Sequence, residues 1–280
     1  MRILVLGSGG LLGSALADNF ADHVVSTAGR RELQTSRPKE IWDLISEARP
    51  DWVINCAADT NVDVAEDDSA GSFAANVVLP ELLAAACLRG GSVLVHFSST
   101  GCYGSWKKEA YDESDSTRPT TTHHRHKLAG EKAVRESGCA ALIVRTGWLF
   151  GGARDNKRNF VWRRIDEASG KREIFSDPFQ SGNPTCISDL AVQVGLMLNM
   201  QLRGTYNCAG QPPTTRLEYV RRIVAHIGFD CVVKPTLEPF TRRAKVSPNE
   251  MAVNRKLSAL GADRMPSWTS SLKSYIDSST

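Results

Sequence analysis

The sequence predicts an α/β protein built on a Rossmann-type doubly wound parallel sheet with a smaller C-terminal lobe. Two observations support this fold class. Short apolar runs alternate with amphipathic helical stretches through the first half of the chain, a pattern typical of parallel sheets covered by helices on both faces. A glycine-rich turn also joins the first apolar run to the first helical stretch.

Each element follows from its own stretch of sequence. Buried strands are expected at residues 3–6, 24–27, 52–57, 92–98 and 141–146. Helices are expected at residues 11–19, 40–47, 67–88 and 123–136. After about Gly151 this rhythm loosens, and Pro, Gly and Asn cluster at residues 177–185 and 211–213. We therefore expect a Rossmann domain over residues 1–150 and a lobe interleaved with it over residues 151–280.

Composition excludes several classes of partner. The 280 residues carry a net charge of +3 and no run of five like charges, which argues against nucleic acid. No apolar stretch is expected to reach the about 18 residues that a membrane helix needs, and the first residues do not resemble a signal peptide. The seven cysteines stand singly, which argues against a disulfide framework and a zinc site. These features favour a cytoplasmic protein.

The turn Gly7-Ser-Gly-Gly10-Leu11-Leu12-Gly13 follows a strand and opens a helix. In this context the first glycine allows a tight turn, the second lets the backbone approach a pyrophosphate, and the third allows close packing of helix on strand. The helix N-terminus then presents free N–H groups and a positive dipole end to the phosphates. The loop therefore predicts a nicotinamide dinucleotide site.

The end of the second strand indicates which dinucleotide binds. NAD-selective proteins place an acidic residue there for the ribose 2′-hydroxyl. This chain has Arg30 and Arg31 instead, and its first carboxylate is Glu32. Two arginines suit a 2′-phosphate, so NADPH is favoured over NADH.

The spacing Gly-x-x-Gly-x-x-Gly resembles the extended short-chain dehydrogenase/reductases, and further segments are similar to one family within them, the dTDP-4-dehydrorhamnose reductases. These segments are 49–66, 74–80, 96–104, 127–134, 145–151, 159–161, 182–185, 189–191 and 204–207. The resemblance implies a reductase for the 4-keto group of a nucleotide-linked 6-deoxysugar, with residues 151–280 binding substrate and a homodimer left open. It also implies cofactor contacts at Cys56, Ala57, Ala58, Asn76 and Lys127.

Reduction of a ketone leaves an alkoxide, which requires a proton donor and an electrostatic partner. The resembled family supplies a hydroxyl from a strand end and a Tyr and a Lys four residues apart on one helix. These roles are carried over to Ser99, with Thr100 as its neighbour, and to Lys127. Where the tyrosine is expected, this sequence has His123, on the same helix face as Lys127.

His123 leaves three alternatives open. It serves as the acid of a working reductase, although a nearby ammonium would lower its pKa. It serves altered chemistry, such as epimerisation or a retro-aldol rearrangement. Alternatively, catalysis is lost and the protein is a regulatory subunit that binds a dinucleotide or a sugar nucleotide. His123, His124 and His126 point to different faces of a helix, so no metal site is expected.

The resemblance also implies substrate contacts, divided between the Rossmann domain and the C-terminal lobe. The candidates are Thr100, Tyr103, Trp148, Asn159, Phe160 and Arg242.

Overall fold

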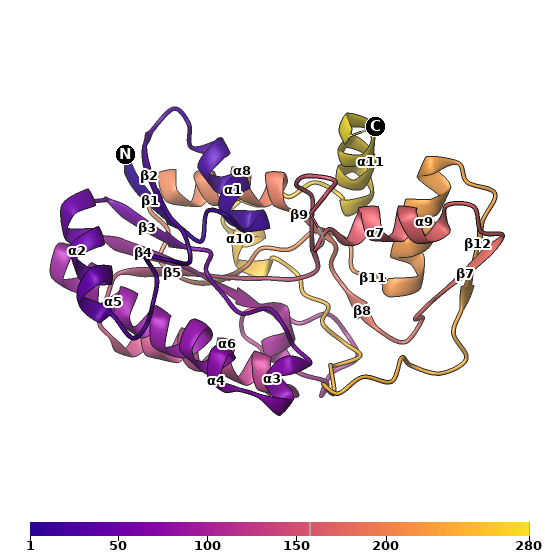
Figure 1. Cartoon of the computed structure of the whole chain (residues 1–280), viewed down its shortest axis with the longest axis horizontal. Coiled ribbons are helices and arrows are strands. Elements are labelled where there is room, and N and C mark those ends of the chain that lie inside the picture. The colour runs from indigo at the N-terminus through magenta and orange to yellow at the C-terminus, as the bar shows by residue number, and fades with distance from the viewer. Residues whose placement is uncertain (157, 280) are drawn as a thin grey trace.

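The computed structural model describes residues 1–156 and 158–279, which form two lobes joined side by side (Figure 1). The larger lobe contains a six-stranded sheet in the order β10-β5-β4-β3-β1-β2, and every neighbouring pair of strands is parallel. The predicted doubly wound parallel sheet is therefore confirmed. The strands are β1 (Arg2–Leu6), β2 (Val24–Ala28), β3 (Trp52–Asn55), β4 (Val93–Ser99), β5 (Ala141–Thr146) and β10 (Gly204–Asn207).

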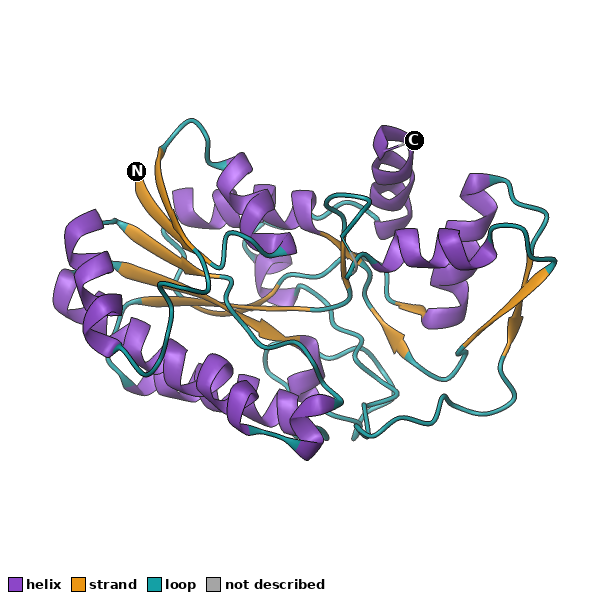
Figure 2. Cartoon of the chain, viewed as in Figure 1, coloured by secondary structure: helices purple, strands orange, loops and turns teal. Residues whose placement is uncertain are grey.

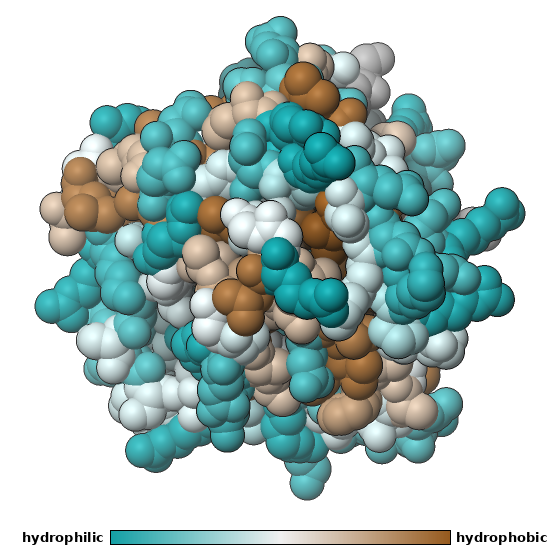
Figure 3. Space-filling model, turned by 90° about the vertical axis from the view of Figure 1, so that its left-hand side faces the viewer, coloured by the Kyte–Doolittle hydropathy of each residue, from teal (hydrophilic) through white to brown (hydrophobic). Residues whose placement is uncertain are grey.

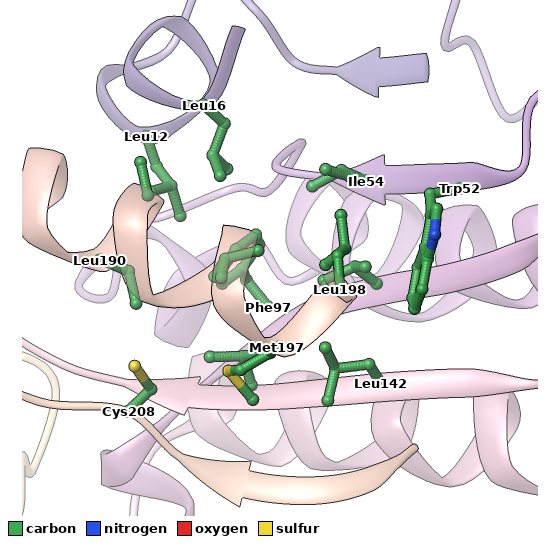
Figure 4. Close-up of a cluster of buried hydrophobic side chains, with 14 of the residues drawn as sticks. Leu12, Leu16, Trp52, Ile54, Phe97, Leu142, Leu190, Met197, Leu198 and Cys208 are labelled. Atoms are coloured by element: carbon green, nitrogen blue, oxygen red, sulfur yellow. The ribbon is translucent and has the colours of Figure 1, made fainter. Parts of the chain in front are cut away.

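Helices cover both faces of this sheet (Figure 2). Because side chains alternate along a strand, Ile3 and Val5 point to one face and Leu4 and Leu6 to the other. The first face packs against α1 (Leu11–Asn19) and α8 (Ile187–Asn199). Figure 4 shows side chains of these two helices meeting those of β3, β4 and β5. The second face packs against α2 (Pro38–Ala48) and α5 (Leu79–Gly90), with α6 (Thr122–Glu136) beside them.

The helix expected at residues 67–88 is divided. The structure has α3 (Val64–Asp67), α4 (Ala70–Phe73), the π-helix η1 (Ala74–Val78) and then α5. The helical run 70–90 is 21 residues long and apolar enough to cross a membrane, so the expectation that no such stretch exists was wrong. Half of its most apolar window is buried, and the run packs against α2 and α6, as a core helix does. Viewed from the end of the sheet, apolar residues are scattered among polar ones (Figure 3).

The smaller lobe has its own apolar core, to which Phe150, Val161, Ile223 and Ile276 contribute. Its helices are α7 (Phe160–Ala168), α9 (Arg216–Ile227) and α11 (Trp268–Ser279). Short strands of this lobe pair with one another: β6 (Leu149–Phe150) with β9 (Thr185–Cys186), β7 (Glu173–Ser176) with β12 (Val232–Pro235), and β8 (Ser181–Gly182) with β11 (Thr214–Thr215). Between these segments the chain returns to the larger lobe, where α8 covers one face of the sheet and β10 adds its last strand beside β5. Helix α10 (Arg255–Ala259) packs beside β10. The division at residues 150 and 151 stays a prediction.

Candidate functional site

The glycine loop lies where the sheet changes direction. Strand β1 pairs with β2 on one side and with β3 on the other, so the connections from β1 and β3 diverge and leave a crevice at their carboxyl ends. Gly7 has φ +78°, and a Cβ there would lie 2.7 Å from the backbone nitrogen of Ala57. A Cβ on Gly13 would collide with the carbonyl oxygen of Gly7. The turn can thus pack this closely only because these positions are glycine, and it leaves the N-terminus of α1 at the place where such folds bind a pyrophosphate.

Five further predicted cofactor residues lie on the segments that follow β1 and β3. Leu11 and Leu12 form the first turn of α1, while Cys56, Ala57 and Ala58 follow β3. Asn76 is fully buried, and its amide donates hydrogen bonds to the carbonyl oxygen of Asp59 (2.9 Å) and to Ser72 Oγ (3.2 Å). Asn76 therefore holds the loop after β3 against η1. Its direct contact with a cofactor stays a prediction.

The two arginines and the acid that bear on cofactor choice lie just after β2. Arg30 and Arg31 follow Ala28, and the Gly29 N–H donates a hydrogen bond of 2.9 Å to Glu32 Oε2. A carboxylate is therefore held just after β2, the part of the fold where NAD-selective proteins place an acid. Two positive side chains, which suit the 2′-phosphate of NADPH, therefore lie beside one carboxylate, which suits the 2′-hydroxyl of NADH. The preference for NADPH stays a prediction.

Helix α6 carries the predicted catalytic pair. Thr121 caps its N-terminus by accepting a hydrogen bond from the His124 N–H (3.1 Å), which fixes the first turn. His123 and Lys127 are buried, with 7% and 5% of their surfaces exposed. The His123 ring meets that of His124 edge to face, with centroids 5.0 Å apart. Among the described residues, His123 Nδ1 has no hydrogen-bond partner.

Burial controls the ionisation of this pair. It lowers the pKa of His123 to about 3, with smaller contributions from His124 and Lys127. It lowers the pKa of Lys127 to about 8, partly opposed by Cys102 and Glu131. Behind them on β4, His96 accepts a hydrogen bond from Asn55 (3.3 Å), and burial lowers its pKa to about 3. At neutral pH the site therefore holds neutral imidazoles and one ammonium.

The predicted hydroxyl groups lie at the end of β4. Ser99 Oγ accepts a hydrogen bond from the Gly101 N–H (3.1 Å), so it caps the short 3₁₀ turn that follows. Thr100 is buried against Gly147, where any added Cβ would strike its hydroxyl. Both stay candidates for the catalytic hydroxyl and the substrate contact.

The structure gives Tyr103 a different place from the predicted one. It is fully buried, and its hydroxyl donates a hydrogen bond of 2.7 Å to Asn207 Oδ1. Its ring stacks on Tyr111 with centroids 5.0 Å apart, and the guanidinium carbon of Arg145 lies 4.9 Å from its centroid. Tyr103 has no exposed surface to offer a substrate, because it joins β10 to the turn after β4.

Two polar side chains that the sequence interpretation missed meet Trp148. Trp148 adopts φ +44°, an uncommon conformation for a non-glycine residue, and its ring packs on Gly182. Its Nε1 donates a hydrogen bond of 2.9 Å to Glu250 Oε2, and the Arg216 guanidinium carbon lies 3.5 Å from its ring centroid. Burial lowers the pKa of Arg216 to about 10 and raises that of Glu250. No motif marks either residue, since they lie far from Trp148 in sequence.

The other substrate candidates divide into two groups. Asn159 is fully buried and caps α7, and its amide donates to the carbonyl oxygens of Gly151 (3.2 Å) and Ala153 (3.1 Å). It holds the lobe together and has no exposed surface for a ligand. Phe160, in contrast, lies 4.9 Å from the guanidinium carbon of Arg216 and so borders the Trp148 cluster.

Arg242 belongs to a segment, residues 236–250, that we call the strap. The strap runs from the smaller lobe back to α3 (Figure 1). Arg242 binds Asp63 with two hydrogen bonds of 2.8 and 3.2 Å, and Arg243 pairs with Asp67. Arg242 therefore joins the two lobes, and its guanidinium is already paired.

Within residues 1–156 and 158–279, no three His, Cys, Asp or Glu side chains are grouped to hold a metal ion.

A glycine turn at the switch point of a parallel sheet, together with a buried lysine and histidine on α6, defines a dinucleotide-binding Rossmann protein of the oxidoreductase type. The chain belongs to the family described as the RmlD substrate binding domain, whose model matches residues 1–280. The resemblance stated from the sequence is thereby confirmed.

Individual relatives agree with this family. A dTDP-4-dehydrorhamnose reductase of Mycobacterium tuberculosis is 32% identical over 98% of this chain and 92% of its own length. A probable dTDP-4,6-dihydroxy-2-methyloxan-3-one 4-ketoreductase of Streptomyces antibioticus is 34% identical over 69% of this chain and 66% of its own. The crystal structure of a dTDP-4-dehydrorhamnose reductase of Clostridium acetobutylicum superposes with a TM-score of 0.93, 30% identity and 99% coverage of both chains. That of Bacillus anthracis, in complex with NADP, also gives 0.93, with 27% identity and 99% coverage of both.

Proposed function

We propose that this protein reduces the 4-keto group of a dTDP-linked 6-deoxysugar with NADPH or NADH. The observation that carries the proposal is the buried pair Lys127 and His123 on α6, with Lys127 near enough to Cys56 after β3 to act on it electrostatically. The chain also matches reductases of this kind over nearly its whole length. Gly7, Gly10 and Gly13 would hold the pyrophosphate, and the bound reduced cofactor supplies the hydride.

Lys127 supplies the positive charge of the site. With a pKa of about 8 it is mostly protonated at pH 7, and its buried ammonium stabilises an alkoxide strongly because little water screens it. Within the described residues its ammonium has no hydrogen bond or ion pair. It is therefore free to bind the cofactor ribose and the reacting oxygen.

His123 acts as a neutral donor. With a pKa of about 3 it is not an imidazolium at neutral pH, so it polarises the carbonyl through its N–H instead of supplying a full charge. We assign the proton to Nε2, because a proton on the buried, unpartnered Nδ1 would leave a donor unsatisfied. Hydride addition then leaves an alkoxide that takes the Nε2 proton, and the imidazolate that remains, stabilised by the Lys127 ammonium, regains a proton from solvent.

Arg216 is proposed to bind the diphosphate of the substrate. Among the described residues, the guanidinium of Arg216 makes one hydrogen bond, to Gln180 Oε1 at 3.5 Å, so most of its N–H groups remain available. A planar guanidinium stacked on Trp148 is oriented for two parallel hydrogen bonds to phosphate oxygens. The contacts Arg216–Trp148–Glu250 lead from this position to His124, beside His123.

The low pKa of His123 favours one alternative, a protein that binds the dinucleotide and sugar nucleotide without turnover. Both functions are tested by incubating the protein with NADPH and a dTDP-4-keto-6-deoxysugar and following the near-ultraviolet absorbance of the reduced cofactor. The reductase predicts loss of absorbance and formation of the 4-hydroxy sugar. Tight NADPH binding without product would support the binding protein.

Two variants then test the assigned roles. His123→Ala is expected to lower kcat by about 100-fold, the usual contribution of a positioned proton donor. His126→Ala is the matched control, because His126 is on the same helix but contacts Ser72 (3.0 Å) instead of the crevice. Equal effects of the two substitutions would remove His123 from the mechanism.

A further inference from the structure

His124 and Glu250 face each other across the junction of the two lobes. His124 lies on α6 of the larger lobe, and Glu250 lies at the end of the strap. The distance from His124 Nε2 to Glu250 Oε1 is 3.9 Å, and the two side chains are 7% and 8% exposed. This distance is too long for a hydrogen bond. Within the described residues, neither atom has another hydrogen-bond partner.

The hydrogen bonds around His124 favour one of the two tautomers of its ring. Thr121 Oγ1 already accepts the backbone N–H of His124 (3.1 Å), so its own proton is free to be donated to His124 Nδ1, 3.0 Å away. We therefore assign the ring proton to Nε2, which points a donor toward Glu250. The ring cannot tilt away easily, because it packs against Gly101 where even a Cβ would collide.

Glu250 is held just as firmly. Its Oε2 accepts the hydrogen bond of 2.9 Å from Trp148 Nε1, and Trp148 is fixed between Gly182 and the guanidinium of Arg216. Its Oε1 is thereby left facing His124 as an unfilled acceptor. A donor and an acceptor that face each other without a direct hydrogen bond offer a place for a third polar group that satisfies both.

The geometry selects the chemistry of that group. An oxygen about 2.8 Å from both atoms would lie off the line that joins them. The angle at this oxygen between His124 Nε2 and Glu250 Oε1 would be about 90°, which is compatible with the geometry of a hydroxyl group. The group must accept from Nε2–H and donate to a carboxylate at once. A hydroxyl does both, whereas a ketone or an ionised phosphate cannot donate.

We propose that His124 and Glu250 form a clamp for one hydroxyl group of the substrate sugar and so determine which sugars bind. This inference rests on the proposed sugar-nucleotide substrate. The clamp adjoins His123, since the rings of His123 and His124 are in contact, so the clamped hydroxyl lies near the carbonyl that is reduced.

The clamp is tested by calorimetric binding in the presence of NADP⁺, with dTDP and a dTDP-6-deoxyhexose as the two probes. In Glu250→Gln the amide oxygen can keep the bond from Trp148, but an NH₂ group then faces the N–H of His124. The dTDP-6-deoxyhexose is expected to bind roughly 10- to 100-fold more weakly, with dTDP unchanged. His124→Gln should weaken binding of the sugar nucleotide by a similar factor, and His126→Gln is the matched control. Equal weakening of both probes, or of neither, would overturn the clamp.

Analogues that lack the C2 or the C3 hydroxyl identify the clamped group. For one of them, loss of the hydroxyl should weaken binding to the wild type but not to Glu250→Gln, because the hydroxyl and the carboxylate act as a pair. Additive losses for both analogues would contradict the clamp. These measurements need no turnover, so an intact clamp in a protein without reductase activity would refute the proposed reaction alone.

Discussion

Replacing Lys127 by methionine is expected to stabilise the free protein at pH 7 while it removes reductase activity. Burial lowers the pKa of Lys127 from 10.5 to about 8, which means that the folded state disfavours the charged form. At pH 7 the ammonium is charged in both the folded and unfolded states, and its full burial cost is present. As pH rises from 8 to 10.5 the unfolded chain binds more protons than the folded one, so stability rises.

The size of the effect follows from the shift. The difference of 10.5 minus about 8 is about 2.5 pKa units, and at 1.36 kcal/mol per unit it corresponds to about 3 kcal/mol. Methionine has a similar length and no charge, so Lys127→Met should raise the free energy of unfolding at pH 7 by up to about 3 kcal/mol. At pH 9 the wild type should have recovered roughly 1 kcal/mol of this difference.

Urea denaturation of both proteins without cofactor, at pH 7 and pH 9, measures the two values. Lys127→Arg is the control, because it keeps the charge and should give no gain in stability. The reasoning is refuted if Lys127→Met is less stable than the wild type at pH 7, or if the gap between them stays constant from pH 7 to pH 9.

Three further outcomes are expected. Burial lowers the pKa values of His96, His123 and His124 from 6.5 to about 3, 3 and 4. The free energy of unfolding should therefore fall as pH drops below 6.5, by roughly 2 kcal/mol per histidine at pH 5. A denaturation series in which stability is flat from pH 6.5 to 5 would contradict the burial of these histidines as neutral groups. Tyr103→Phe should lower the free energy of unfolding by about 1 kcal/mol through the lost bond to Asn207, and unchanged stability would show that this bond contributes nothing. Asp63→Asn should cost less than about 1 kcal/mol, since Arg242 and Asp63 are 39% and 40% exposed, and a loss above 2 kcal/mol in the same assay would show that the strap is a structural support.

Much of the fold could be predicted because its signals are local. Helix α1 and strand β5 have the predicted bounds, since a glycine turn or an apolar run delimits each of them. Strand β10 was missed because Gly204-Thr-Tyr-Asn207 has no apolar run and becomes a strand only by pairing with β5. The single helix predicted at residues 67–88 is interrupted by a π-helical turn at residues 74–78. In this turn the Asn76 carbonyl oxygen packs closely against Gly130 of α6, a contact between distant residues that the local sequence does not indicate.

The site could be predicted only in part. The spacing of four residues placed His123 and Lys127 on one helix face, and the glycine pattern located the crevice. Glu250 and Arg216 could not be found in this way, because their partner Trp148 is brought to them by folding and not by spacing. Tyr103 and Asn159 were chosen by resemblance, whereas burial and hydrogen bonds within the chain account for both.

Reduction at the sugar C4 is tested most directly with NADPH that carries deuterium at the transferred position. After incubation with a dTDP-4-keto-6-deoxysugar, the product sugar is analysed by mass spectrometry and NMR. The proposed function predicts one deuterium at C4 and an equal amount of oxidised cofactor. Unlabelled product, deuterium at another carbon, or unchanged substrate despite bound cofactor would contradict it.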